Sequence, residues 1–126
     1  MNVKTDTKEK FSVITPKENI LSVNMTEELT HLLLLYLQKD IPHIILNLQE
    51  VGQLDEKSGE LLAQAQQKFY ENNFSFVICG LQKNVEDNLD KQELLELMNV
   101  TPTESEAWDI VQMEEIEREL FLGDED

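Results

Sequence analysis

One short segment of this 126-residue chain places two carboxylates, an amine and a hydroxyl next to one another. Its residues are Leu54, Asp55, Glu56, Lys57, Ser58 and Gly59. A serine hydroxyl can accept a phosphoryl group, and a carboxylate at the first turn of a helix is stabilised by the helix dipole. If a helix begins here, the segment is a candidate regulatory or protein-binding site.

The flanking segments predict a β-α-β unit that would place this site. Residues 43–48 and 74–79 are nearly continuous in apolar character, as expected of neighbouring parallel strands covered on both faces. Residues 56–72 between them have the periodicity of an amphipathic helix. A right-handed crossover puts the start of that helix at the carboxyl end of the first strand, where α/β proteins often place function.

The rest of the chain predicts one α/β domain built around this unit. Residues 10–15 and 19–23 are short apolar-alternating runs around a turn at residues 16–19, which predicts an antiparallel hairpin. A helix capped by Asn24 or Thr26 should follow. We expect a mixed, mostly parallel sheet of roughly four to five strands with helices packed on it, in the order β-β-α-β-α-β-α-β-α.

The C-terminal part should complete the sheet and cover it. Residues 84–98 predict one helix, or two short helices broken near Asp90. Residues 99–102 predict a short edge strand, a position that tolerates the proline at its end. Thr103 and Glu106 have the spacing of a capping box, so a last helix should begin there.

These patterns divide the chain into a flexible N-terminus (residues 1–9), the domain (10–112) and an acidic extension of the last helix with its tail (113–126). Apolar residues interrupt the acids of the extension at helical spacing. They are Ile116, Leu120, Phe121 and Leu122. This stripe either folds back onto the domain or docks on a partner or a second copy of the chain.

The charge balance narrows the classes of partner. The chain has 26 acidic and 10 basic residues, a formal net charge of -16. We expect neither nucleic acid nor an anionic membrane as a partner, since no basic patch is available to neutralise phosphates. A basic protein surface would be attracted, although the acids could simply keep the chain soluble. No run approaches the roughly 20 apolar residues of a membrane span, and the N-terminus does not resemble a secretory signal, so we expect a cytoplasmic protein.

The residues offer little for catalysis. Neither His31 nor His43 stands beside a nucleophile motif, and the four glycines form no phosphate-binding loop. Cys79 is the single cysteine, which excludes an internal disulfide and predicts an inert core thiol. We therefore expect no enzyme activity and no bound cofactor or metal.

Several pieces of the sequence, in this order and spacing, resemble the STAS domain of bacterial anti-sigma factor antagonists. The likeness covers roughly residues 10–112. The segments that carry it are Ile44–Leu48, Val51, Leu54–Asp55, Phe76–Gly80 and Thr103–Ala107. In that family an Asp-Ser-Ser/Thr-Gly motif follows the strand, and a partner kinase that is also the anti-sigma factor phosphorylates the serine after the aspartate. The resemblance implies that the unphosphorylated form binds this kinase and that phosphorylation ends the binding.

The motif of this chain departs from the family pattern by one residue, which leaves two alignments. Without a gap, Asp55 matches the family aspartate and Glu56 stands at the phosphoacceptor position. We favour this alignment, because an insertion that matches Ser58 and Gly59 to the serine-glycine pair would turn the helix by about 100°. Glu56 would then imitate part of the charge of a phosphoserine, and the usual switch would be lost.

Simpler roles for the same residues remain open. Asp55 could merely cap the helix, with Glu56 favoured at its first position by the helix dipole. Ser58 is either a local hydrogen-bonding residue or a phosphosite.

The resemblance leads to three functional hypotheses. The first is a regulator that binds an anti-sigma factor or a serine kinase-like protein through the Leu54–Gly59 edge. The second is a STAS scaffold or assembly module in a larger complex, where the acidic extension could support self-association into a homo-oligomer. The third is a small-ligand or nucleotide-binding domain, which the resemblance permits but no residue specifies.

Overall fold

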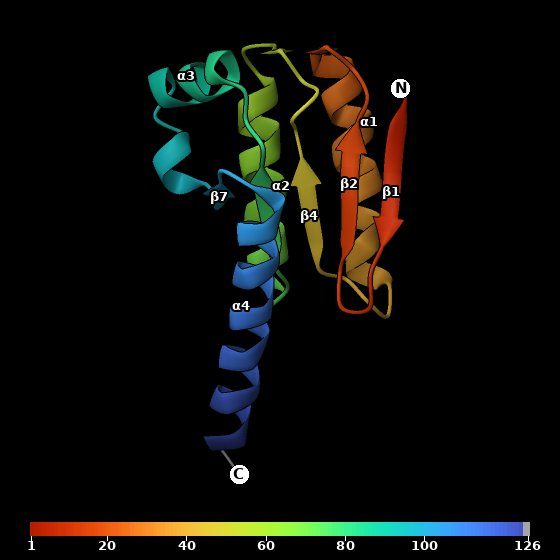
Figure 1. Cartoon of the computed structure of the whole chain (residues 1–126), viewed down its shortest axis with the longest axis vertical. Helices are drawn as coiled ribbons and strands as arrows, with labels where there is room; N and C mark the ends of the chain where they lie inside the picture. Colours follow the sequence, from red (N-terminus) through yellow and green to blue (C-terminus); the bar gives the residue numbers. More distant parts are fainter. Residues whose placement is uncertain (125–126) are drawn as a thin grey trace.

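The computed structural model describes the backbone of residues 1–124 and the side chains of residues 1–121. Its elements, shown in Figure 1, are β1 (Val3–Thr7), β2 (Ser12–Pro16), β3 (Ile20–Leu21), α1 (Val23–Leu34), η1 (Leu35–Gln38), β4 (Ile44–Asn47), β5 (Gln53–Leu54), α2 (Ser58–Glu71), β6 (Phe76–Cys79), α3 (Lys83–Lys91), η2 (Leu95–Leu97), β7 (Val100–Thr101) and α4 (Glu104–Asp124).

A five-stranded sheet in the order β1-β2-β4-β6-β7 forms the centre of the fold. The β1–β2 pair is antiparallel, whereas β2–β4, β4–β6 and β6–β7 are parallel. The central strands β4 and β6 are the two apolar runs of the sequence. The predicted fold class, a single α/β domain with a mostly parallel sheet, is confirmed.

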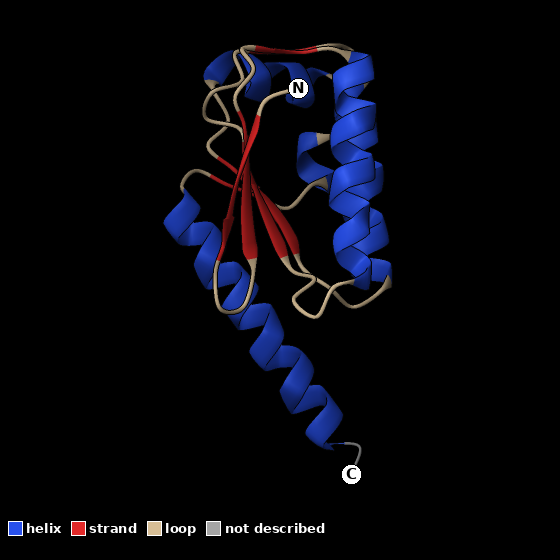
Figure 2. Ribbon diagram, turned by 90° about the vertical axis from the view of Figure 1, so that its right-hand side faces the viewer, coloured by secondary structure: helices blue, strands red, loops and turns tan. Residues whose placement is uncertain are grey.

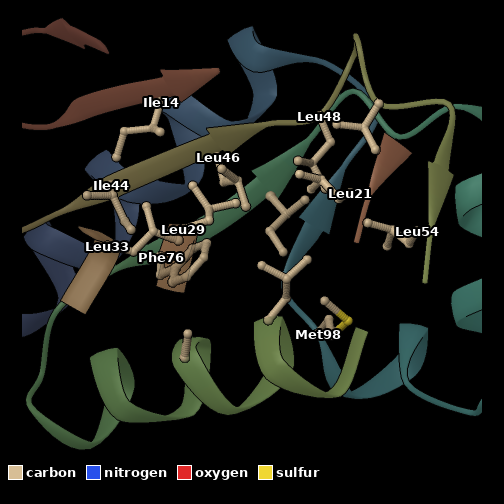
Figure 3. Close-up of a cluster of buried hydrophobic side chains, with 14 of the residues drawn as sticks. Ile14, Leu21, Leu29, Leu33, Ile44, Leu46, Leu48, Leu54, Phe76 and Met98 are labelled. Atoms are coloured by element: carbon tan, nitrogen blue, oxygen red, sulfur yellow. The ribbon is translucent and has the colours of Figure 1, made fainter. Parts of the chain in front are cut away.

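Both faces of the sheet are covered by helices (Figure 2). Alternate residues of β4 and β6 face opposite sides, because successive side chains of a strand point in opposite directions. Ile44 and Phe76 lie in the larger core with Leu29 and Leu33 of α1 (Figure 3). On the other face, Ile45 and its partner Val77 pack with Ala107 and Val111 from α4, and the partly buried Trp108 packs against this cluster.

The predicted N-terminal arrangement is wrong. Residues 1–9 are not a loose tail, since Val3–Thr7 forms β1 and pairs with Ser12–Pro16 along its whole length. β1 is mostly exposed and polar, so its pairing depends on backbone hydrogen bonds and leaves no apolar period to detect. Residues 19–23 do not pair with residues 10–15. Instead β3 pairs in parallel with β5 in a separate two-stranded sheet.

The C-terminal expectations are confirmed in outline. The 84–98 region consists of α3 and the short η2 helix, with a break after Lys91. β7 is the edge strand, and α4 follows it directly. Thr103 Oγ1 accepts a hydrogen bond from the backbone N–H of Glu106 at 3.2 Å, as a capping box requires.

Polar contacts at the end of the sheet hold the middle of α4 in place. His43 Nε2 lies 2.7 Å from a carboxylate oxygen of Glu115, and His43 Nδ1 accepts a hydrogen bond from the backbone N–H of Ser75 at 3.0 Å. Arg118 donates to the hydroxyl of Ser75 at 3.0 Å, and the hydroxyl of Tyr70 donates to Glu114 at 2.9 Å. His43 thus occupies a structural position, with Nδ1 unprotonated and Nε2 carrying the proton.

Protonation of His43 should destabilise the fold. Burial lowers its pKa below the ordinary value of 6.5, and Arg118 acts in the same direction, while Glu115 and Glu114 oppose the shift. As the pH falls through 6.5, His43 takes up a proton in the unfolded state more readily than in the folded state. The free energy of unfolding should therefore fall. Because one proton is involved, this contribution cannot exceed about 1.4 kcal/mol per pH unit.

The variant His43→Asn is the control, because its side-chain oxygen can accept the Ser75 bond without titrating. Urea unfolding between pH 7 and pH 5.5 should show a steeper loss of stability in the natural chain than in His43→Asn. Equal slopes in the two proteins would contradict the assigned role of His43.

Candidate protein-binding site at the start of α2

The candidate site lies at the sheet edge where β4 ends and where α1 and α2 both begin (Figure 1). The short β3–β5 ladder carries the chain to this edge, with Leu21 opposite Leu54. Both leucines are buried in the larger core (Figure 3). Leu54, one of the six residues predicted for the site, therefore holds the segment to the core and is not accessible to a partner.

Asp55 caps a different helix from the one expected. Its carboxylate accepts a hydrogen bond at 3.1 Å from the backbone N–H of Val23, the first residue of α1. This location favours a negative charge, since the N-terminus of a helix carries a partial positive charge. The prediction that Asp55 caps α2 is wrong, because its side chain is used by a helix that starts 32 residues earlier in the chain.

The cap of α1 also differs from expectation. Ser22, rather than Asn24 or Thr26, is its N-cap, and Ser22 Oγ accepts a hydrogen bond from the N–H of Met25 at 3.2 Å. Thr26 is thereby available for a contact with the second helix. The sequence predicted that Thr26 lies near a helix start, but it did not predict the contact of Thr26 with the second helix.

Ser58 is the first residue of α2, and its side chain is fully buried. Thr26 Oγ1 donates to Ser58 Oγ at 2.8 Å, and Ser58 Oγ donates to the carbonyl of Leu21 at 3.4 Å. The hydroxyl therefore joins the starts of α1 and α2 through partners 32 and 37 residues away, rather than bonding to the backbone near its own helix start. A kinase could not reach it in this conformation.

Gly59 lets α2 pack closely against Leu89 of α3 and against Leu94, which follows α3. A Cβ atom at this position would lie 2.7 Å from a methyl group of Leu89 and 3.0 Å from one of Leu94. The first distance is shorter than real carbon contacts and the second is tight, so a side chain here would require the two leucines to shift. Gly59 belongs to the packing of the site rather than to its surface.

Glu56 and Lys57 are the two predicted site residues that lie exposed. They form a turn that is closed by a hydrogen bond of 2.9 Å from the N–H of Ser58 to the carbonyl of Asp55. Helix α2 consequently begins two residues later than residue 56, the predicted start, and Glu56 is not its first residue. An acid and a base next to each other on a rigidly held turn can recognise a charged protein surface.

The described residues give no other chemical centre at this edge. Burial raises the pKa of the Cys79 thiol to about 12, so the group remains a neutral core thiol. Within the described part of the chain, no three His, Cys, Asp or Glu side chains are placed to share a metal ion. Over the same range, none of the helices combines the length and apolar character that crossing a membrane requires.

Solved structures with the same fold include anti-sigma factor antagonists and part of an anion transporter. A Thermotoga maritima protein described as a putative anti-sigma factor antagonist has a TM-score of 0.76 at 19% identity, covering 87% of this chain and 94% of the other. SpoIIAA of Bacillus, an anti-sigma factor antagonist, has been solved in unphosphorylated and phosphorylated forms. Its unphosphorylated form has a TM-score of 0.69 at 17% identity, covering 88% of this chain and 96% of the other. The murine anion transporter Slc26a9 has a TM-score of 0.68 at 15% identity, covering 82% of this chain but 18% of the transporter.

No curated protein sequence matches this chain. The sequence model of the STAS domain matches residues 2–107, which include β1 and the whole candidate site. This match spans most of the chain and agrees with the fold of the solved structures. The chain belongs to the STAS domain family.

Proposed function

We propose that this chain is a regulatory protein-binding domain of the anti-sigma factor antagonist type, without the usual serine switch. Its partner is an anti-sigma factor or a related serine kinase-like protein. The partner docks on the edge formed by residues 54–59, where Glu56 and Lys57 supply the exposed groups and the other four residues hold them in place.

The observation that carries this proposal is the exposure of Glu56 and Lys57 beside a buried Ser58. In the alignment that starts from Asp55, Glu56 stands at the phosphoacceptor position. In the alignment that matches Ser58 and Gly59 to the serine-glycine pair, the residue before that pair is Lys57. Neither a carboxylate nor an amine accepts phosphate from a serine kinase, so both alignments remove the switch.

The charges of this edge favour a basic partner surface. Glu27 and Glu28 lie exposed in the first turns of α1, and Glu56 and Glu60 lie exposed around the start of α2. Lys57 is the one base among them. The carboxylate of Glu56 supplies only part of the charge of a phosphoserine. Because this charge is permanent, binding would not be regulated by phosphorylation at this position.

A scaffold or assembly module is the second candidate, because one solved relative carries this fold as a small part of a transporter. An assembly role needs no phosphate transfer and would use the same unmodified residues. The two functions differ in whether a kinase is among the stable partners.

Phosphate transfer to engineered serines tests the proposal. The natural chain and the variants Glu56→Ser and Lys57→Ser should be used as bait in the native cell, and the recovered complexes incubated with magnesium and ATP. We expect a serine kinase-like protein in each complex, no phosphate on the natural chain, and phosphate on one variant, which identifies the acceptor position.

Intact-mass spectrometry with site mapping gives the readout. Phosphate on Ser58 of the natural chain would contradict the proposal. A stable assembly without a kinase, and with both variants unmodified, would favour the scaffold.

Substitutions of Ser58 test whether its hydroxyl belongs to the fold. Ser58→Ala removes the partner of Thr26 and should lower the free energy of unfolding by about 1 kcal/mol. Ser58→Glu places an unpaired charge in a buried position and should cost several times as much, on the order of 3 to 5 kcal/mol. Glu56→Gln, an exposed change next to it, should leave stability within about 0.5 kcal/mol. Urea unfolding checks all three, and a fully stable Ser58→Glu would show that the site opens readily.

A further inference from the structure

The second half of α4 presents apolar side chains to solvent. Met113, Ile116, Leu120 and Phe121 are 58%, 54%, 65% and 71% exposed. Met113, Ile116 and Leu120 are three and four residues apart, so they lie on one side of the helix. This half of α4 extends past the ends of the strands (Figures 1 and 2). We call Met113, Ile116 and Leu120 the α4 stripe. Phe121 lies farther around the helix, on the side of Glu114 and Arg118, and the side chain of Leu122 lies outside the described residues.

The side of α4 that faces the domain is polar in the same region. Glu114, Glu115 and Arg118 make the contacts to Tyr70, His43 and Ser75 described above. An amphipathic helix normally turns its apolar side to the core, so this half of α4 has the reverse orientation. The polar contacts hold the helix so that the stripe points away from the domain.

A groove continues the stripe onto the body of the protein. It has a volume of about 510 Å³ and lies between α4 and the turn that joins β1 to β2. Phe11 and Trp108 line it, with their rings in edge contact at 5.1 Å between centroids. The rest of the lining is mixed, with Lys8 and Lys10 from the turn and Glu115 and Glu119 from α4. Ile116 borders the groove as well and joins its apolar part to the stripe. A partner helix lying along α4 could contact both.

The charges beside the stripe indicate what could cover it. Three exposed acids lie on α4: Asp109, Glu117 and Glu119. The one basic residue among the described side chains of α4 is Arg118, which is partly buried against Ser75. A second copy of the chain would bring acid against acid, with a net charge of -16 on each copy. A helix that carries lysines or arginines beside its apolar side would instead pair with these carboxylates.

We propose that the α4 stripe and the adjoining groove bind a basic amphipathic helix of a partner protein. The partner helix would place apolar side chains at a spacing of three and four residues against Met113, Ile116 and Leu120. This surface lies away from the α2 edge, toward the opposite end of the sheet (Figure 1). The proposal concerns an interface separate from the one assigned to Glu56 and Lys57, and it holds or fails independently of that function.

A pair of synthetic helical peptides of about 20 residues, or roughly five turns, tests the proposal. One has leucines along one side and lysines beside them, and the other has glutamates in place of the lysines. We expect the lysine peptide to bind, by fluorescence anisotropy, and the glutamate peptide not to bind. Ile116→Ser with Leu120→Ser should weaken binding at least tenfold.

Two exposed leucines elsewhere supply the matched control. Leu35 and Leu97 are 58% and 78% exposed, and Leu35→Ser with Leu97→Ser should leave the affinity unchanged. Circular dichroism should show that both double variants stay folded.

The proposal is overturned if the lysine peptide fails to bind, or if the two double variants affect binding equally, since the peptide would then be attracted by overall charge. It is also overturned if sedimentation shows a dimer that only Ile116→Ser with Leu120→Ser dissociates. That result would make a second copy the occupant.

Discussion

The parallel pairing of β4 with β6, buried on both faces, is the constraint on which the rest of this structure depends. Ile44, Ile45, Phe76 and Val77 are buried, and neighbours within each strand face opposite cores. Parallel strands require a crossover, so α2 must begin at the carboxyl edge of β4 and run back along the sheet. The second face needs its own cover, which α4 provides.

The two ends of this arrangement present different surfaces. At the carboxyl edge, Asp55 is bound to α1 and Ser58 to Thr26, so the starts of two helices are joined by side chains that the solvent does not reach freely. The turn between them holds Glu56 and Lys57 outward without using either in packing. At the other end, α4 is longer than the sheet it covers. The contacts of Glu115 with His43 and of Arg118 with Ser75 hold the helix where it passes the end of the sheet. A single fold thus presents one charged surface and one apolar surface bordered by acids.

The sequence predicted those features that depend on local periodicity. The strands around Ile45 and Val77 were evident from their apolar runs, and the start of α4 was evident from its capping box. β1 escaped prediction because an exposed, polar edge strand has no apolar period. The roles of Asp55 and Ser58 could not be inferred, because both depend on partners in another helix, 32 residues away. The assignment of the six residues to a binding site remains a proposal, and their division into buried supports and exposed groups required the tertiary structure.

The central claim is tested most directly by the affinity of the partner recovered with the natural chain for variants of the α2 turn. Glu56→Ala with Lys57→Ala should weaken binding at least tenfold by isothermal titration calorimetry, which is about 1.4 kcal/mol. Lys68→Ala with Glu71→Ala removes a similar exposed pair from the far end of the same helix and should have no effect. Unchanged affinity in the first variant, or equal loss in both, would contradict the account.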